Sequence, residues 1–183
     1  MQHRQLPSRI NVVGTSGSGK SMFARRLAQV MNCAHIEMDK VFWEPNWKQP
    51  TDEAFFERLR EAIRDDRWVL DGNYTRSVSV KWERVEMIIW LDYSFARTLY
   101  QAVKRAIGRA FSRKELWEGT GNRESFGKLF SRDSIVVWTI NTYTSNRAKY
   151  ESYLSDARYA HIKFVRLRDH AEAETFLRAV SAN

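Results

Sequence analysis

The sequence has few of the residues that covalent cross-links and metal clusters require. Cys33 is the only cysteine among the 183 residues, so no internal disulfide can form and a multi-cysteine metal site is excluded. A chain of this length can bury roughly 70% of the surface that its unfolded form exposes, so its core needs no such support. A lone cysteine also suits a reducing compartment, where we expect it to act as a small buried hydrophobe.

Long apolar runs, repeats and low-complexity linkers are also missing, and there are only three prolines. No stretch approaches the roughly 18 apolar residues of a membrane-spanning helix. The first residues, 1–9, lack the apolar stretch of a signal peptide. We therefore expect no membrane association, a cytoplasmic location, and one domain that spans residues 1–183.

Acidic residues are outnumbered, and the formal net charge is +8. Such a surface can serve nucleic acid, an acidic membrane or small anionic ligands such as nucleotides. The sequence contains no helix-turn-helix, zinc-finger or RRM pattern, so binding to nucleic acid is the less favoured reading.

Apolar runs alternate with amphipathic stretches along the chain, as expected for a parallel sheet with helices on both faces. Continuous apolar runs indicate buried parallel strands. Together they predict an α/β fold, a three-layer α/β/α sandwich. The predicted strands are 9–13, 35–38, 68–70, 87–91 and 162–167. The predicted helices are 19–31, 52–64, one that follows Ser94, 125–154 with an interruption near Asp133, and one that begins at Asp169.

A glycine-rich segment between the first predicted strand and helix matches G-x-x-x-x-G-K-[ST] in full. Its residues are Gly14, Thr15, Ser16, Gly17, Ser18, Gly19, Lys20 and Ser21. The glycines allow a backbone in which successive N–H groups turn toward an anion, and the positive end of the following helix faces the same anion. We expect Lys20 to reach the β- and γ-phosphates of a nucleoside triphosphate, most simply ATP, and Ser21 to bind Mg²⁺.

A carboxylate is also expected near the metal, at the end of a strand beside this loop. Asp71 and Asp92 both follow apolar runs, so the pattern alone does not decide between them. Asp71 is the favoured metal-side residue because Gly72 follows it and permits a close approach of the backbone. For Asp92 we expect a turn or capping role.

Asp39 is a third aspartate at the end of a predicted strand. Open α/β sheets bind their ligands at the carboxyl ends of parallel strands. Asp39 is therefore a candidate base or anchor for the group that accepts a phosphoryl group, and its alternative is a carboxylate bonded to the loop backbone. Trp43, Trp47 and Tyr74 flank the same edge, where they could stack on a base, shape an acceptor pocket or pack in the core.

Arginines crowd the helix after the fourth strand and the charged stretch that follows it. They are Arg97, Arg105, Arg109, Arg113 and Arg123. An inserted arginine can accelerate phosphoryl transfer by roughly 10³ to 10⁵-fold, and Arg105 and Arg109 are our catalytic candidates. Residues 108–125 are predicted to form a mobile lid. The alternative is a solvated helix face with loose ion pairs.

Together these residues resemble a known family. The loop GTSGSGKS, Asp39 with Trp43-Glu44-Pro45-Asn46-Trp47, and Trp68-Val69-Leu70-Asp71-Gly72-Asn73-Tyr74 are similar to adenylate-kinase-related P-loop kinases. The resemblance is greatest to the small bacterial proteins labelled DNA topology modulation proteins or adenylate-kinase-like ATPases. It implies a nucleotide-kinase-like P-loop NTPase fold with strand order 2-3-1-4-5 and a helical lid. It also implies ATP and Mg²⁺ at the loop, and an acceptor over the ends of the second and third strands.

Three functions remain open from the sequence. The favoured one is a kinase that moves the γ-phosphoryl group of ATP to a small nucleotide-like or hydroxyl-bearing acceptor. The others are a regulatory or toxin-like NTPase switch and an ATP-dependent protein that binds nucleic acid. The pattern does not identify the acceptor or an oligomeric state.

Overall fold

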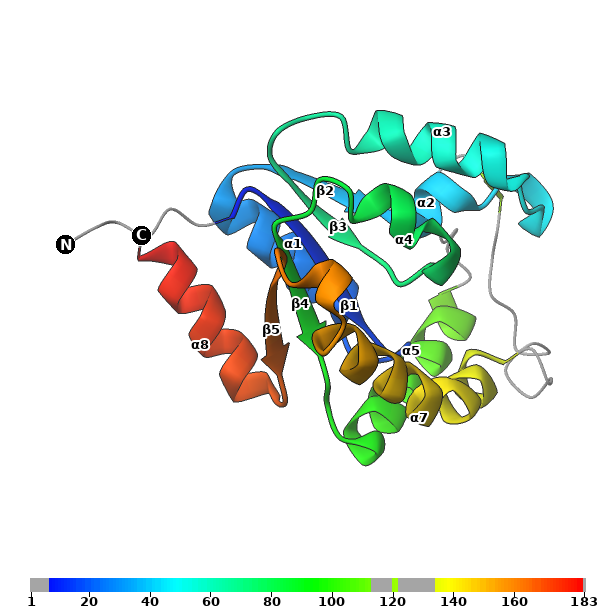
Figure 1. The fold of residues 1–183 in the computed structure, drawn as a ribbon. Coiled ribbons are helices and arrows are strands. Elements are labelled where there is room, and N and C mark those ends of the chain that lie inside the picture. The colour runs from blue at the N-terminus through cyan, green and yellow to red at the C-terminus, as the bar shows by residue number, and fades with distance from the viewer. Residues whose placement is uncertain (1–6, 113–119, 122–133, 183) are drawn as a thin grey trace.

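A computed structural model describes residues 7–112, 120–121 and 134–182 of the chain (Figure 1). Its five strands form one parallel sheet in the order β2-β3-β1-β4-β5, which confirms the predicted sheet and strand order. The strands are β1 (Arg9–Gly14), β2 (Ala34–Glu37), β3 (Trp68–Asp71), β4 (Met87–Leu91) and β5 (Lys163–Leu167).

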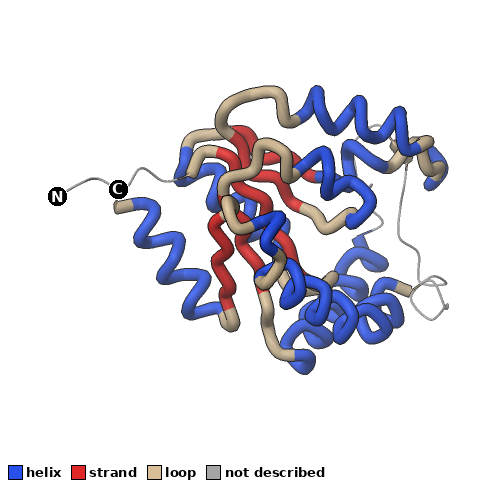
Figure 2. Tube along the Cα trace, in the orientation of Figure 1, coloured by secondary structure: helices blue, strands red, loops and turns tan. Residues whose placement is uncertain are grey.

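Helices enclose this sheet on both faces (Figure 2). The longer ones are α1 (Lys20–Met31), α3 (Asp52–Ala62), α5 (Phe95–Ser112), α7 (Ile135–Leu154) and α8 (His170–Ser181). Two short helices, α2 (Met38–Phe42) and α4 (Val78–Lys81), follow β2 and β3. Within the part of the chain that the structure describes, no helix is both long and apolar enough to cross a membrane.

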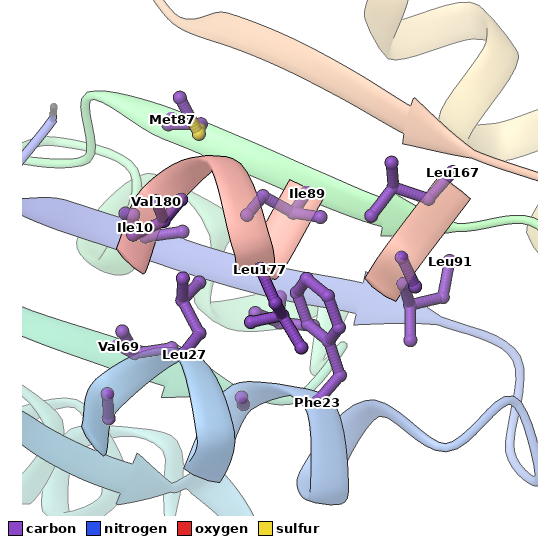
Figure 3. Close-up of a cluster of buried hydrophobic side chains, with 14 of the residues drawn as sticks. Ile10, Phe23, Leu27, Val69, Met87, Ile89, Leu91, Leu167, Leu177 and Val180 are labelled. Atoms are coloured by element: carbon purple, nitrogen blue, oxygen red, sulfur yellow. The ribbon is translucent and has the colours of Figure 1, made fainter. Parts of the chain in front are cut away.

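One layer of the core lies between the sheet and the helices α1 and α8. Phe23 and Leu27 of α1 are one turn apart and point to the same side, as do Leu177 and Val180 of α8 (Figure 3). They pack against buried strand residues such as Ile89. Each such side chain contributes roughly 1.5–3 kcal/mol through its burial.

The opposite face of the sheet is covered by α3, α4 and the second half of α7. Phe55 and Leu59 of α3 are fully buried there, and Tyr150 of α7 packs on Trp90 of β4 with 5.7 Å between ring centroids. The two packed faces make a three-layer α/β/α arrangement, and both layers fix the carboxyl ends of the strands that carry the site described below.

The second strand ends earlier than its sequence pattern predicts. β2 stops at Glu37, and Asp39 lies in the first turn of the short helix α2 instead of at a strand end. The chain turns here because Met38 is buried beneath Gly72: a Cβ atom on Gly72 would lie only 2.7 Å from the Cβ of Met38. The carboxylate of Asp39 is thereby moved to the exposed edge.

The predicted long helix at 125–154 is described only from residue 134 onward. Ser134 begins α7 by accepting a hydrogen bond from the Val136 N–H at 3.2 Å, so a helix start lies next to the predicted interruption at Asp133. Residues 122–133 lie outside the described residues.

Candidate phosphate-binding site

The segment 14–21 leaves the sheet at the end of β1 and enters α1 at Lys20. Gly17 and Gly19 adopt φ angles of 87° and 88°, values that side chains with a Cβ rarely tolerate. Apart from the bond from the Ser18 N–H to the Thr15 carbonyl at 3.1 Å, the amides of 15–19 donate no backbone hydrogen bond within the described residues. These N–H groups and the start of α1 therefore remain available to an anion.

The loop is held from outside by α5 and α7. A Cβ atom on Gly17 would lie 2.7 Å from the carbonyl oxygen of Thr98 and 2.9 Å from the Cβ of Ala102, so α5 packs directly on the loop backbone. The hydroxyl of Thr139 on α7 donates to the carbonyl of Ser16 at 3.3 Å. Both helices therefore support the backbone of the loop directly.

A buried polar atom inside the loop points to the ligand that it would hold. The hydroxyl oxygen of Ser18 is buried and has no hydrogen-bond partner within the described residues. Buried polar atoms are rarely left unpaired in folded proteins, and such an atom calls for a partner. Together with the available loop amides, it fits the oxygen atoms of a bound phosphate.

The ammonium group of Lys20 lies over the loop and donates to the carbonyl of Thr15 at 3.2 Å. Burial lowers the pKa of Lys20, and the nearby positive charge of Arg105 lowers it further, whereas the charges of Asp71 and Asp39 raise it. The structure therefore brings three other predicted site residues, Asp71, Arg105 and Asp39, close to the ammonium group of Lys20.

Asp71 is buried at the end of β3, beside Val12 of β1 and Glu37 of β2 in the sheet register. Burial raises its pKa to about 6 and outweighs the ammonium of Lys20 and the hydroxyl of Ser21, which both lower it. The carboxyl group of Asp71 and the hydroxyl of Ser21 thus face each other beside the loop. Within the described residues no group of three or more acidic, histidine or cysteine residues could hold a metal ion, so a cation here would depend on phosphate and water oxygens as well.

Asp92, in the segment between β4 and α5, takes part in a different contact. Its carboxylate accepts hydrogen bonds from Nε and Nη2 of Arg166 at 2.8 and 2.6 Å, and Arg147 lies 3.4 Å away. These ion pairs tie β4 to β5 and α7. They leave Asp71 as the strand-end carboxylate beside the phosphate loop.

The first residue of the loop is held by a side chain to which the sequence pattern gave no role. The amide oxygen of Asn73 accepts a hydrogen bond from the Gly14 N–H at 3.1 Å, and its amide nitrogen donates to the Gly14 carbonyl at 2.7 Å. The hydroxyl of Tyr150 donates to the same Asn73 oxygen at 2.9 Å. Bonds from a side chain to a distant backbone group follow no sequence spacing. The only available signal was the position of Asn73, two residues after a strand-end aspartate.

The acceptor side of the site contains Asp39 and Tyr74. The hydroxyl of Tyr74 donates to Oδ1 of Asp39 at 2.6 Å, and Tyr74 has a positive φ of 23°. Burial and the Asp39 carboxylate raise the pKa of Tyr74, which keeps its hydroxyl protonated, while Arg76 and Trp43 act in the opposite direction. The rings of Trp43 and Trp47 lie 5.5 Å apart at the edge of the same region.

The predicted arginines are placed only in part. Arg105 of α5 donates to the hydroxyl of Ser16 at 3.4 Å, so this arginine reaches the loop. Arg109 lies one turn later on α5, and its side chain is outside the described part of the chain. Arg113, Arg123 and most of the predicted lid, 108–125, also lie outside the described residues.

The sheet order, the loop between β1 and α1, and the helices on both faces define the chain as having the P-loop kinase fold. Among solved structures, it is similar to a gluconokinase from Sinorhizobium meliloti, with a TM-score of 0.52 and 16% identity over 98% of this chain and 97% of that one. It is also similar to a shikimate kinase from Acinetobacter baumannii in complex with shikimate, with a TM-score of 0.55 and 13% identity over 93% of this chain and 89% of that one. No protein-family model and no curated protein sequence matches the chain. The similarity therefore extends to the fold of small-molecule kinases.

Proposed function

We propose that this protein is a kinase that transfers the γ-phosphoryl group of ATP, with Mg²⁺, to a hydroxyl group of a small acceptor. The observation that carries the proposal is the grouping of Lys20, Asp71 and Asp39 at one end of the sheet, beside a loop in which, within the described residues, only the Ser18 amide of 15–19 donates a backbone hydrogen bond. The likeness of the fold to a gluconokinase and a shikimate kinase supports it.

In this proposal the loop amides and the Ser18 hydroxyl bind the phosphate oxygens, and Lys20 stabilises the charge that grows on the transferred group. Ser21 and Asp71 are the residues that would hold the metal. Mg²⁺, when bound, would neutralise negative charge on the phosphate groups. Arg105, which already touches Ser16, would add positive charge to the same group.

Asp39 is assigned to the acceptor. Its Oδ1 is engaged by Tyr74, whereas its Oδ2 has no hydrogen-bond partner within the described residues. Oδ2 can therefore accept a hydrogen bond from an acceptor hydroxyl and take its proton as the oxygen attacks the γ-phosphorus.

The local charges favour a hydroxyl over a phosphate acceptor. Asp39 and Asp71 lie at this edge, and their negative charges would repel a second phosphate group, whereas Glu37 is paired with Lys40 at 3.1 Å and Arg25 at 3.8 Å. Arg76, an arginine beside Tyr74 in the chain that could contact a phosphate, forms an ion pair with Asp52 at 2.8 Å and lies over the ring of Phe42 at 4.7 Å. Its charge is thus already partly neutralised.

A single experiment tests the reaction class. Purified protein is mixed with ATP, Mg²⁺ and a pooled library of sugar acids, cyclic polyols, nucleosides and nucleoside monophosphates, and ³¹P NMR follows the products. We expect a new phosphomonoester that disappears when EDTA removes the metal. Inorganic phosphate as the only product would contradict the proposal and indicate an NTPase.

A substitution of Tyr74, which donates a hydrogen bond to Asp39, tests the role proposed for Asp39. Replacing Tyr74 with phenylalanine removes one hydrogen bond to a charged group, so kcat should fall roughly tenfold while KM for ATP stays unchanged. Tyr159→Phe, at a tyrosine whose ring lies edge-on to that of Trp82, is the control and should behave as the wild type. An equal loss of kcat in both variants would contradict a role for Tyr74 in holding Asp39 toward the acceptor.

A further inference from the structure

A fully buried lysine lies behind the phosphate loop and takes no part in the proposed chemistry. Lys81, the last residue of α4, has 0% of its surface exposed. No carboxylate within the described residues forms an ion pair with it. Burial, followed by the charge of Lys149, lowers its pKa to about 7. A buried amine without an anionic partner costs folding free energy, so a compensating contact is expected.

That contact is with the backbone after β3. Nζ of Lys81 donates to the carbonyl oxygen of Asn73 and, at 3.4 Å, to that of Gly72. The Gly72 carbonyl also accepts from Nδ2 of Asn11 at 3.3 Å. Of the two carbonyls, the one on Asn73 therefore depends more on the lysine.

The backbone that Lys81 holds carries the side chain that clamps the phosphate loop. Asn73 bonds both the N–H and the carbonyl of Gly14. Lys81 is thus connected to the loop by two sets of hydrogen bonds, the first from Lys81 to Asn73 and the second between Asn73 and Gly14. The hydroxyl of Tyr150 on α7 supports Asn73 as well. A methionine at position 81 would fill the same volume but would leave the Asn73 carbonyl without its donor.

From this chain of contacts we propose that Lys81 is a positioning residue for the phosphate loop, acting through Asn73 on Gly14. The inference rests on the proposed function only in that the loop binds ATP with Mg²⁺. The inference itself concerns how firmly Asn73 holds the backbone of Gly14, and hydrogen exchange measures this without nucleotide.

The first test is a double-mutant cycle read by calorimetric titration with MgATP. Lys81→Met and Asn73→Ala should each weaken binding roughly tenfold, and the double variant should bind no more weakly than Asn73→Ala alone, because both changes act on one contact path. If the two losses multiply, or if Lys81→Met binds as tightly as the wild type, the inference is overturned. Lys163→Met, at an exposed lysine at the start of β5, is the matched control and should bind normally.

The same titration separates the inference from the proposed function. A wild-type protein that fails to bind MgATP would refute the proposed function, and hydrogen exchange would then decide the inference alone. In Lys81→Met the amide of Gly14 should exchange at least about tenfold faster than in the wild type, while the amides of Ile88 and Ile89 in β4 change only with global stability. Equal acceleration at all three sites would reduce Lys81 to a general structural role and overturn the inference.

Lys81→Met is expected to fold because an apolar side chain of similar volume removes a buried amine that has no counter-charge. Lys81→Gln is the second variant, since its amide keeps an uncharged donor on a shorter stem. It should lie between the wild type and Lys81→Met in both measurements. If Lys81→Gln folds and Lys81→Met does not, the double-mutant cycle pairs Lys81→Gln with Asn73→Ala. Losses of MgATP affinity that multiply in the double variant would again overturn the inference.

Discussion

Replacing Lys20 with alanine is expected to reduce phosphoryl transfer by roughly 10³-fold, the upper end of the loss when one donor that stabilises developing negative charge is removed. The ammonium group lies over the loop and within the influence of Asp71 and Asp39, and no other lysine of the described residues takes that place. The loss should appear in kcat and in MgATP affinity, measured by a coupled ADP assay and by titration.

The control for this variant is Lys163→Ala, which removes the same charge at an exposed position of β5. It should leave turnover and affinity unchanged. Circular dichroism should show that both variants keep the fold, because Lys20 makes one hydrogen bond to the Thr15 carbonyl and no ion pair within the described residues. Full turnover in Lys20→Ala would refute the assignment of the loop as the nucleotide site.

Asp39→Asn is expected to lower kcat by roughly 10²- to 10⁴-fold, the usual contribution of a general base, with little change in MgATP affinity. Asparagine keeps the shape of the side chain and can still accept the hydrogen bond from Tyr74, but its amide does not take a proton from a hydroxyl. The measurement is kcat and KM for ATP with the acceptor that the ³¹P experiment identifies.

Asp66→Asn provides the control, since this exposed aspartate pairs with Arg84 and Arg9 at the opposite end of the sheet. Two outcomes would contradict the assignment of Asp39. A parallel loss of MgATP affinity would place Asp39 with the nucleotide, and an unchanged kcat would move the base to another residue.

Both predictions concern residues that the sequence had already singled out, and the reason is local geometry. Residues 14–21 form their loop from neighbours in the chain, with glycines where φ is positive and a helix that starts at Lys20. The motif therefore needs no distant partner to be recognised. The same holds for the strands, because runs such as 87–91 are buried on both faces and read as continuous apolar segments.

The choice between Asp71 and Asp92 could not be made in the same way. Both aspartates follow an apolar run, and their difference lies in partners that are far away in the sequence. Asp92 is taken by Arg166, 74 residues later, whereas Asp71 faces Ser21 and Lys20 across β1. The strands β3 and β4 both pair with β1, so the partners of the two side chains, and not the order of the strands, distinguish Asp71 from Asp92.

By itself, the sequence determined the sheet-and-helix layers, the phosphate loop and the set of candidate carboxylates, because each depends on residues within a few positions of one another. The tertiary structure decided the early end of β2 before Asp39, the clamp of Asn73 on Gly14, and the burial of Lys81 behind it. These features depend on side chains that meet backbone groups of other elements. Such contacts are set by packing and by the need to satisfy buried polar groups, and neither has a period along the chain.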